Sequence, residues 1–300
     1  LGKFIASVIF FITLYLALLA YLLIGGEFLR IILSGWWDIS YTTGVMLVAI
    51  FGFGVVFKGL KVTGFLETVL TTLLVVMILG LAGYTFNLSD KENFSLLKAD
   101  GDYFLPYGII LFALAGGSAI PEIRNFLSGR RGQVLKSVII LGTLVPVFVY
   151  AIFITAVLGA SGNATSPEAL AGLASILGQT FVKYGAFIGF LAVITSFFTI
   201  GLNIQNSFRL DFGQSKFLSS FLTAAVPLAL FFYGHNDFIK ILSFTGAVLG
   251  GLEGLLLLFI WRRAKKRGDR KPEYQLGLSR AAVFTLAFIF LAGVIYQFIY

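Results

Sequence analysis

Residues 111 to 127, LFALAGGSAIPEIRNFL, place two glycines, a serine, a proline and a glutamate inside an apolar run. A glycine inside a helix costs about 1 kcal/mol relative to alanine, and an interior proline costs about 3 kcal/mol. We therefore expect the helix to stop near Ala115 and to restart after a glycine link. Ser118 is expected to cap a second half-helix from 119 to 127, with Pro121 in its first turn, where the missing N–H is no loss.

A helix interrupted in this way has a definite binding chemistry. The carbonyl groups that end the first half and the amide groups that start the second half carry opposite partial charges. An amino acid zwitterion fits this arrangement, because its ammonium group meets carbonyls and its carboxylate meets amides. The predicted substrate-binding residues at the break are Phe112, Ala113, Ala115, Gly116, Gly117 and Ser118. A merely kinked helix without a ligand is the alternative.

A second polar pattern lies in VITSFFTIGLNIQNSF, residues 193 to 208. Its members Thr195, Thr199, Asn203 and Asn206 recur at intervals of four, four and three residues, so they share one helical face. Hydroxyls on an apolar helix usually bond to carbonyls of their own helix. They are also oxygen ligands of the kind that a hard cation prefers.

The elements that hold these residues are membrane helices. The 300 residues are 58% hydrophobic and 12% charged, which is far from the composition of a soluble domain. Nine continuous apolar runs predict transmembrane helices, at 4–25, 40–57, 64–85, 103–127, 135–159, 179–206, 216–233, 236–261 and 281–299. The runs do not alternate as barrel strands do, so we expect an all-α polytopic membrane protein with a single transmembrane domain over residues 1–300.

Two glutamates lie inside these apolar runs. Glu122 follows the predicted cap by one turn, and Glu253 lies beside glycines at 246, 250 and 254 that favour close helix packing. Acidic side chains at membrane depth need a partner or a cavity. Glu122 and Glu253 are therefore candidates for gating or for binding a proton, and Arg124 and Arg130 are candidate partners of Glu122.

Enzyme chemistry has little support in this sequence. The chain has no cysteine, its one histidine, His235, follows an apolar run in the short stretch YGHND, and no acidic cluster has metal-ligand spacing. We expect no enzymatic activity and no cofactor. Two alternatives stay open, a passive channel and a membrane-embedded enzyme that uses Glu122 and Glu253.

Basic residues predict the orientation in the cell membrane. If the first run starts in the cytoplasm, 17 of the 22 Lys and Arg residues fall on the cytoplasmic side, including the dense loop 261–280. The positive-inside rule favours this topology. The run WRRAKKRGDRK, residues 261 to 271, is either an ordinary cytoplasmic loop or a contact for anionic lipid head groups. We expect no nucleic-acid partner.

An inverted repeat is suggested by the lengths of two helix triplets. The runs within 4–85 and those within 179–261 have similar total lengths, and they enter the membrane from opposite sides. Such inverted repeats are typical of secondary transporters. We assign 1–85 to the remainder of a first repeat, 103–261 to a second repeat and 281–299 to an additional helix.

The segment FALAGGSAIPEI, residues 112 to 123, resembles the sixth helix of permeases in the amino acid, polyamine and organocation superfamily, especially the aromatic amino acid and amino acid/auxin permeases. YLALLAYLLIGGEFL, residues 15 to 29, resembles their third helix. The resemblance implies an eleven-helix symporter of the bacterial leucine transporter fold that works by alternating access. Nothing matches helices one and two, so the chain is expected to be an N-terminally truncated permease.

The resemblance also implies a substrate and a coupling ion. The substrate would be a neutral, aromatic or large apolar amino acid, and we place Tyr15, near the middle of the first run, beside it. Thr195 and Ser196 match the hydroxyl pair of the eighth helix that sodium-coupled relatives use as ion ligands. Sodium-independent relatives often carry a lysine in the fifth helix, and residues 65–80 contain none. Sodium is therefore the favoured coupling ion and the proton is the alternative.

Overall fold

The computed structural model describes residues 2–59, 64–95, 104–120, 123–124, 127, 132–267 and 276–299, and this described backbone is helical without strands. The longer helices are α1 (Gly2–Leu33), α2 (Tyr41–Lys58), α3 (Gly64–Phe86), α7 (Gly132–Ser161), α9 (Gln179–Leu210), α10 (Lys216–Phe232), α12 (Gly251–Arg267) and α13 (Arg280–Ile299). The shorter ones are α4 (Lys91–Ser95), α5 (Leu105–Ala113), α8 (Ala174–Leu177) and α11 (Phe238–Phe244). Three 3₁₀ segments, η1 (Gly117–Ala119), η2 (Gly162–Ala164) and η3 (Ala171–Leu173), and one π-helical segment, η4 (Thr245–Gly250), complete the described elements.

Among the described residues, seven helical segments are long and apolar enough to cross a membrane. By length and composition these are Phe4–Leu33, Tyr41–Lys58, Thr68–Phe86, Val134–Ala164, Gln179–Leu210, Phe238–Ala264 and Arg280–Ile299. The predicted class, an all-helical polytopic membrane protein, is confirmed. The other two predicted runs contain α10, with 17 residues, and α5, with 9 residues. The total of nine crossings and the inverted repeat stay predictions.

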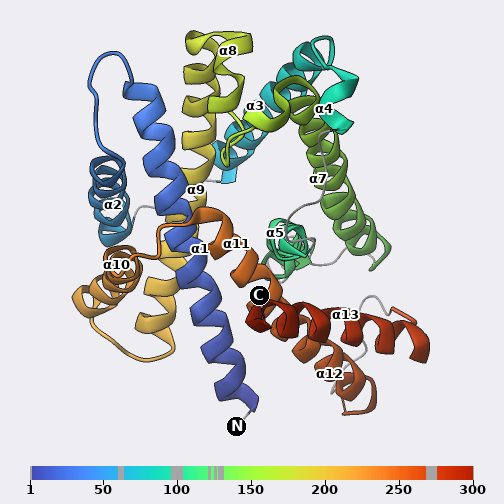
Figure 1. Cartoon of the computed structure of the whole chain (residues 1–300). Helices are drawn as coiled ribbons and strands as arrows, with labels where there is room; N and C mark the ends of the chain where they lie inside the picture. Colours follow the sequence, from blue (N-terminus) through green and yellow to red (C-terminus); the bar gives the residue numbers. More distant parts are fainter. Residues whose placement is uncertain are drawn as a thin grey trace. The chain divides into compact units, whose positions relative to one another are not determined.

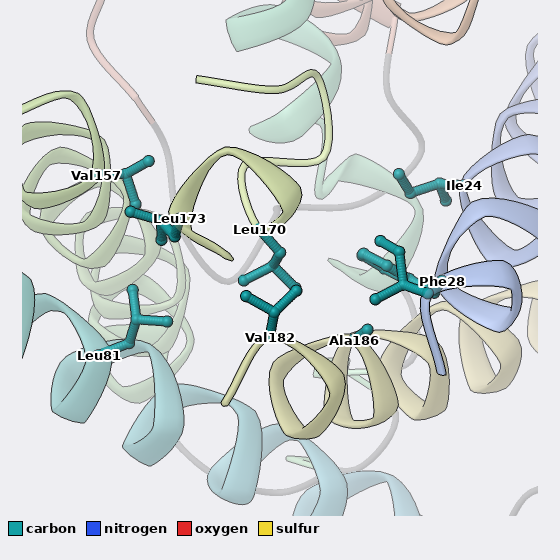
Figure 2. Packing of buried hydrophobic residues seen from close by; sticks show 9 residues of the cluster. Ile24, Phe28, Leu81, Val157, Leu170, Leu173, Val182 and Ala186 are labelled. Carbon is teal, nitrogen blue, oxygen red and sulfur yellow. The ribbon is translucent and has the colours of Figure 1, made fainter. Parts of the chain in front are cut away.

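Contacts divide the chain into two compact units. Unit 1 comprises Leu1–Thr13, Gly101–Tyr150 and Leu242–Tyr300, and unit 2 comprises Leu14–Asp100 and Ala151–Ile241. In unit 2, α9 contacts α2, α3 and α10, and α10 also contacts α2 (Figure 1). A cluster of buried apolar residues packs in this unit (Figure 2). Its members are Ile24, Phe28, Ile31, Leu81, Val157, Leu170, Leu173, Val182 and Ala186.

Close backbone contacts at glycines hold α1 against α2. A Cβ atom at Gly44 would lie 2.6 Å from the carbonyl oxygen of Gly26, and one at Gly26 would lie 2.7 Å from the backbone nitrogen of Val45. Side chains at either position would therefore force the two helices apart. α1 also runs to Leu33, whereas the first apolar run was expected to end near residue 25. The glycines after Ile24 serve this crossing and do not end the helix.

A buried glutamine ties three helices of unit 2 together. Gln205 of α9 is 1% exposed. Its side-chain amide donates to the Val56 carbonyl of α2 over 3.1 Å and to the Ser220 hydroxyl of α10 over 2.6 Å. A polar group in an apolar interior is costly without such partners, so these bonds fix how α2, α9 and α10 meet.

Unit 1 is held by a comparable glycine contact. A Cβ atom at Gly246 in η4 would lie 1.7 Å from the Gly108 carbonyl oxygen of α5. On the next turns, Gly250 contacts the Leu111 side chain of α5, and Gly254 contacts the Phe290 ring of α13. The glycines at 246, 250 and 254 therefore serve helix packing, as their spacing predicted, and α12 contacts α13 in the same unit (Figure 1).

We expect Gly44→Ala to destabilise the protein by about 1–3 kcal/mol, because its methyl group would meet rigid backbone at the α1–α2 crossing. The matched control is Gly54→Ala in the same helix, where nothing among the described residues lies within 4 Å of the added Cβ atom. Thermal unfolding of the purified proteins in detergent measures the difference. Equal melting temperatures for the two variants would contradict the proposed role of the crossing.

Candidate functional site

The predicted interruption of the helix after residue 103 is confirmed. α5 begins with Pro106 in its first turn and ends at Ala113. A continuous helix would place the Ala115 N–H on the carbonyl of Leu111. Instead the Ala115 N–H donates to Phe112 over 3.1 Å, and the Gly116 N–H donates to Leu114 over 2.9 Å. The carbonyl of Leu111 thus loses the donor that a continuous helix supplies.

The chain turns again directly after the break. The Ala119 N–H donates to the Gly116 carbonyl over 3.2 Å, which forms η1. The expected half-helix from 119 to 127 is described only in part, with the Leu127 N–H bonded to Ile123 over 2.9 Å. The side chain of Ser118 lies outside the described structure, as do Pro121 and all of Glu122. Capping by Ser118 and the roles suggested for Glu122 stay predictions.

Neither packing nor backbone conformation accounts for the glycines at the break. Among the described residues, nothing lies within 4 Å of a Cβ atom built at Gly116 or Gly117. Gly116 has φ −97° and ψ 9°, which any residue can adopt. Ala113, Ala115, Gly116 and Gly117 are exposed, while Phe112 is half-buried. The break therefore presents backbone to open space, and this space is where a ligand can approach the chain.

The hydroxyls of α9 are bonded to their own helix. Thr195 donates to the Ala192 carbonyl over 2.9 Å, and Ser196 donates to the same oxygen over 3.1 Å. Thr199 donates to the Thr195 carbonyl over 3.1 Å. Each hydroxyl uses its hydrogen in these bonds and keeps its lone pairs, which are what a cation would need. Thr195 and Ser196 are half-buried, whereas Thr199 is exposed.

Tyr15 contacts another helix of its own unit. Its hydroxyl donates to the Leu222 carbonyl of α10 over 3.2 Å, in the helix that contains Pro227. Tyr15, Thr195 and Ser196 belong to unit 2, whereas Phe112 to Ser118 belong to unit 1. The structure therefore describes these two groups of predicted site residues separately, and the role of Tyr15 beside the substrate stays a prediction.

Glu253 lies inside an apolar helix, and Thr13 is its hydrogen-bond partner there. It is half-buried, and its Oε1 atom lies 3.1 Å from the hydroxyl oxygen of Thr13 in α1. Thr13 was not singled out by its sequence pattern, because a lone threonine in an apolar helix usually bonds to its own backbone. Within the described ranges, no three His, Asp or Glu side chains gather as a metal site.

The π-helical segment η4 is a second feature without a sequence prediction. It interrupts the run from Phe238 to Ala264, and it contacts α5 on the turns before the break. Buried Ser243, just before η4, donates to Gln297 of α13 over 2.9 Å. Single π-helical turns are often found at functional sites. The run TGAVLGG, rich in small residues, is the signal that marks this position.

Comparison with known proteins adds independent findings. The sequence model of the tryptophan/tyrosine permease family matches residues 1–300. Glutamine transporter 2 of Aliivibrio fischeri is 23% identical over 264 residues, which cover 83% of this chain and 66% of that protein. The match thus spans slightly less than two thirds of the relative's length, and no solved structure matches the chain. The resemblance to aromatic amino acid permeases is confirmed, since the family match covers the whole chain: this protein belongs to the tryptophan/tyrosine permease family.

Proposed function

We propose that the protein carries a neutral amino acid across the cell membrane by alternating access, and that the break after α5 binds the substrate. The observation that carries this proposal is the open backbone at Gly116 and Gly117. Glycine at these positions is explained neither by a tight contact nor by a left-handed conformation. Membership of a permease family supports transport over the alternatives of a passive channel or a membrane enzyme.

The backbone at the break suits a zwitterion. The carbonyl end of α5, where Leu111 has lost its helical donor, carries partial negative charge and attracts the ammonium group. The N–H groups that follow the break offer hydrogen bonds to the carboxylate. Half-buried Phe112 is the nearest aromatic side chain in the sequence and is suited to contact an apolar part of the substrate.

The substrate class that we propose is an amino acid with an uncharged side chain. The name of the family refers to tryptophan and tyrosine, and the name of the relative refers to glutamine. These three amino acids share a neutral, bulky side chain. Competition among tryptophan, tyrosine and glutamine for uptake into proteoliposomes distinguishes an aromatic site from an amide site.

Gly117→Leu should reduce uptake by more than about tenfold, because its side chain would occupy the space where the substrate meets the backbone. Membrane insertion and melting temperature should stay normal, since the space is open in the structure. Gly142→Leu in α7 is the matched control, because nothing among the described residues lies within 4 Å of a Cβ atom there. Uptake by Gly117→Leu at the level of Gly142→Leu would place the substrate elsewhere.

We propose that transport is coupled to an ion and that sodium binds at Thr195 and Ser196. Both hydroxyls donate to the carbonyl of Ala192, so their lone pairs are free to point at a cation. A sodium site needs several oxygen ligands, and the remaining ligands would come from other helices. A proton is the alternative ion, with Glu122 and Glu253 as its candidate sites.

Replacing Thr195 and Ser196 together by alanine should raise the sodium concentration needed for uptake by about tenfold or more per residue. Each lost ligand is worth about 1–3 kcal/mol, and 1.4 kcal/mol corresponds to a factor of ten. Thr199→Ala is the control, because this hydroxyl belongs to the same helix but is exposed. Wild-type uptake that ignores a sodium gradient and follows a pH gradient would exclude the sodium site.

The orientation that we propose has the start of α1 and the basic loop 261–280 in the cytoplasm. It follows from the distribution of Lys and Arg along the sequence. Nine crossings and an inverted repeat of the bacterial leucine transporter type complete the proposed topology. In this topology, the connection between α7 and α9 is outside and the connection between α9 and α10 is inside.

Single cysteines test this orientation directly, because the chain contains none of its own. Asn163 and Gln214 are both exposed, and they lie in the two connections that the topology places on opposite sides. A membrane-impermeant maleimide added to intact cells should label Asn163→Cys but not Gln214→Cys, and both should react after the membrane is permeabilised. The reverse pattern would invert the topology.

A further inference from the structure

The Thr13 hydroxyl has two acceptor oxygens within reach but only one hydrogen to donate. The Thr13 hydroxyl oxygen lies 2.9 Å from the Ile9 carbonyl oxygen and 3.1 Å from Glu253 Oε1. Both distances are within the range of O–H···O hydrogen bonds or close to it. A threonine hydroxyl carries a single hydrogen, so it can donate to only one of these two oxygens at a time.

The protonation state of Glu253 decides whether both contacts are hydrogen bonds. When the carboxylate is ionised, Thr13 must choose between Glu253 and Ile9, and one of the two oxygens is left without this donor. When the carboxyl group carries a proton, it donates to Thr13, and Thr13 donates to Ile9. The same three oxygens are then joined by two hydrogen bonds in a chain, and hydroxyl groups can act as donor and acceptor together in this way.

No charged residue in the described part of the chain forms an ion pair with Glu253. The ion pairs among the described residues, Arg30–Glu27 and Lys240–Asp237, both lie in unit 2, whereas Glu253 lies in unit 1. The charged and titratable residues on the elements packed against it, and on its own helix, are Lys3, Tyr15, Tyr21, Glu27 and Arg30 on α1, Tyr107 on α5, Arg280 and Tyr296 on α13, and Arg262, Arg263, Lys265, Lys266 and Arg267 on α12. Of those on α1, Tyr15 donates to the Leu222 carbonyl over 3.2 Å, and Glu27 pairs with Arg30.

These neighbouring residues are either far from Glu253 along their helix axes or have other interaction partners. Arg262 is nine residues from Glu253 along α12, which corresponds to about 14 Å at 1.5 Å per residue. Lys3 is ten residues from Thr13, and Arg280 is ten residues from Phe290, the ring that contacts Gly254, so each stands about 15 Å away along its helix. The Tyr107 hydroxyl donates to the Ile289 carbonyl over 3.3 Å.

Tyr296 is also engaged elsewhere, since its ring lies against Phe104 with 4.7 Å between the ring centroids. The Thr13 hydroxyl is therefore the hydrogen-bond partner of the Glu253 carboxyl group on which the proposal rests. The hydrogen bond to Thr13 of α1 therefore depends on whether this carboxyl group carries a proton.

We propose that Glu253 and Thr13 form a proton-binding site in which protonation of the carboxyl group reverses the hydrogen bond between α12 and α1 and joins it to the bond from Thr13 to Ile9. A proton from water binds to a carboxylate oxygen of Glu253, and the Thr13 hydrogen turns from Oε1 to the carbonyl oxygen of Ile9. Release of the proton reverses both steps, and no covalent bond between heavy atoms changes. Since α1 continues beyond Thr13 as one helix to Leu33, the site acts on a helix that both units share.

Infrared difference spectroscopy of the full-length protein in lipid vesicles tests the site without requiring transport. Spectra recorded across the pH range in which carboxyl groups titrate should show a protonated carbonyl band that disappears on ionisation. Glu253→Gln should lack this band. Thr13→Val should move it to higher frequency, because the acid loses its acceptor, while Thr13→Ser should leave it in place.

The outcomes separate clearly. The proposal would be overturned if the wild-type spectra showed no titrating carboxyl band, or if Glu253→Gln did not remove that band. It would also be overturned if Thr13→Val did not shift the band. If Glu253→Gln fails to fold, the matched pair Thr13→Val and Thr13→Ser decides the question by the band shift alone.

A second measurement rests on the proposed transport function. Glu253→Gln permanently supplies a donor to Thr13, so uptake by this variant should lose its dependence on pH over the interval in which the wild-type band titrates. Uptake that follows pH as in the wild type would overturn the link between this site and transport. Absence of uptake by the wild type would instead refute the transport proposal and leave the infrared result standing.

Discussion

Close backbone contact at glycines is the constraint on which both units depend. Between helices in lipid, burial of apolar side chains supplies little driving force, because the lipid tails are as apolar as leucine. Helices must then gain stability from packing at short distance. The crossings of Gly26 with Gly44 and of Gly108 with Gly246 bring backbone to within a distance that no side chain would permit. The positions of α1, α2, α5 and η4 within their units follow from these contacts.

The glycines of the interrupted helix have the opposite surroundings. A glycine in a helix carries an entropic cost of about 1 kcal/mol, and at Gly26 or Gly108 the close crossing offsets this cost. At Gly116 and Gly117 the described structure offers no such contact. Packing within the described residues does not offset the cost there, and this absence of a packing role underlies our proposal that the substrate binds at these glycines.

Buried polar side chains inside the apolar helices are hydrogen-bonded. No fully buried side-chain nitrogen or oxygen in the described residues lacks a hydrogen-bond partner. Gln205 and Ser243 have partners on other helices, and they thereby fix helix positions. Glu253 differs, because its partner Thr13 has a second acceptor within reach. This choice between two acceptors underlies the proton-binding site that we propose, whereas the bonds of Gln205 involve no titratable group.

Local properties of the chain were predictable from sequence because each of them depends on a few consecutive residues. Apolar runs of spanning length mark membrane helices, and the pair Gly116 and Gly117 marks the end of α5 to within two residues of the expected Ala115. The shared face of Thr195 and Thr199 needs only the helical repeat. The end of α1 was predicted too early, because Glu27 and Arg30, which pair over 2.5 Å on one helical face, allow the helix to continue.

The sequence by itself determined that this protein is a helical membrane protein with one interrupted helix, since composition and helix breaking are local. Only the tertiary structure decided which glycines pack and which are open, because this depends on the neighbour across the crossing. It also decided that Gln205 faces α2 and α10, although its spacing excludes it from the polar face of Thr195. The partner of Glu253 is 240 residues away in the sequence, and no periodicity within either helix specifies a contact over that separation.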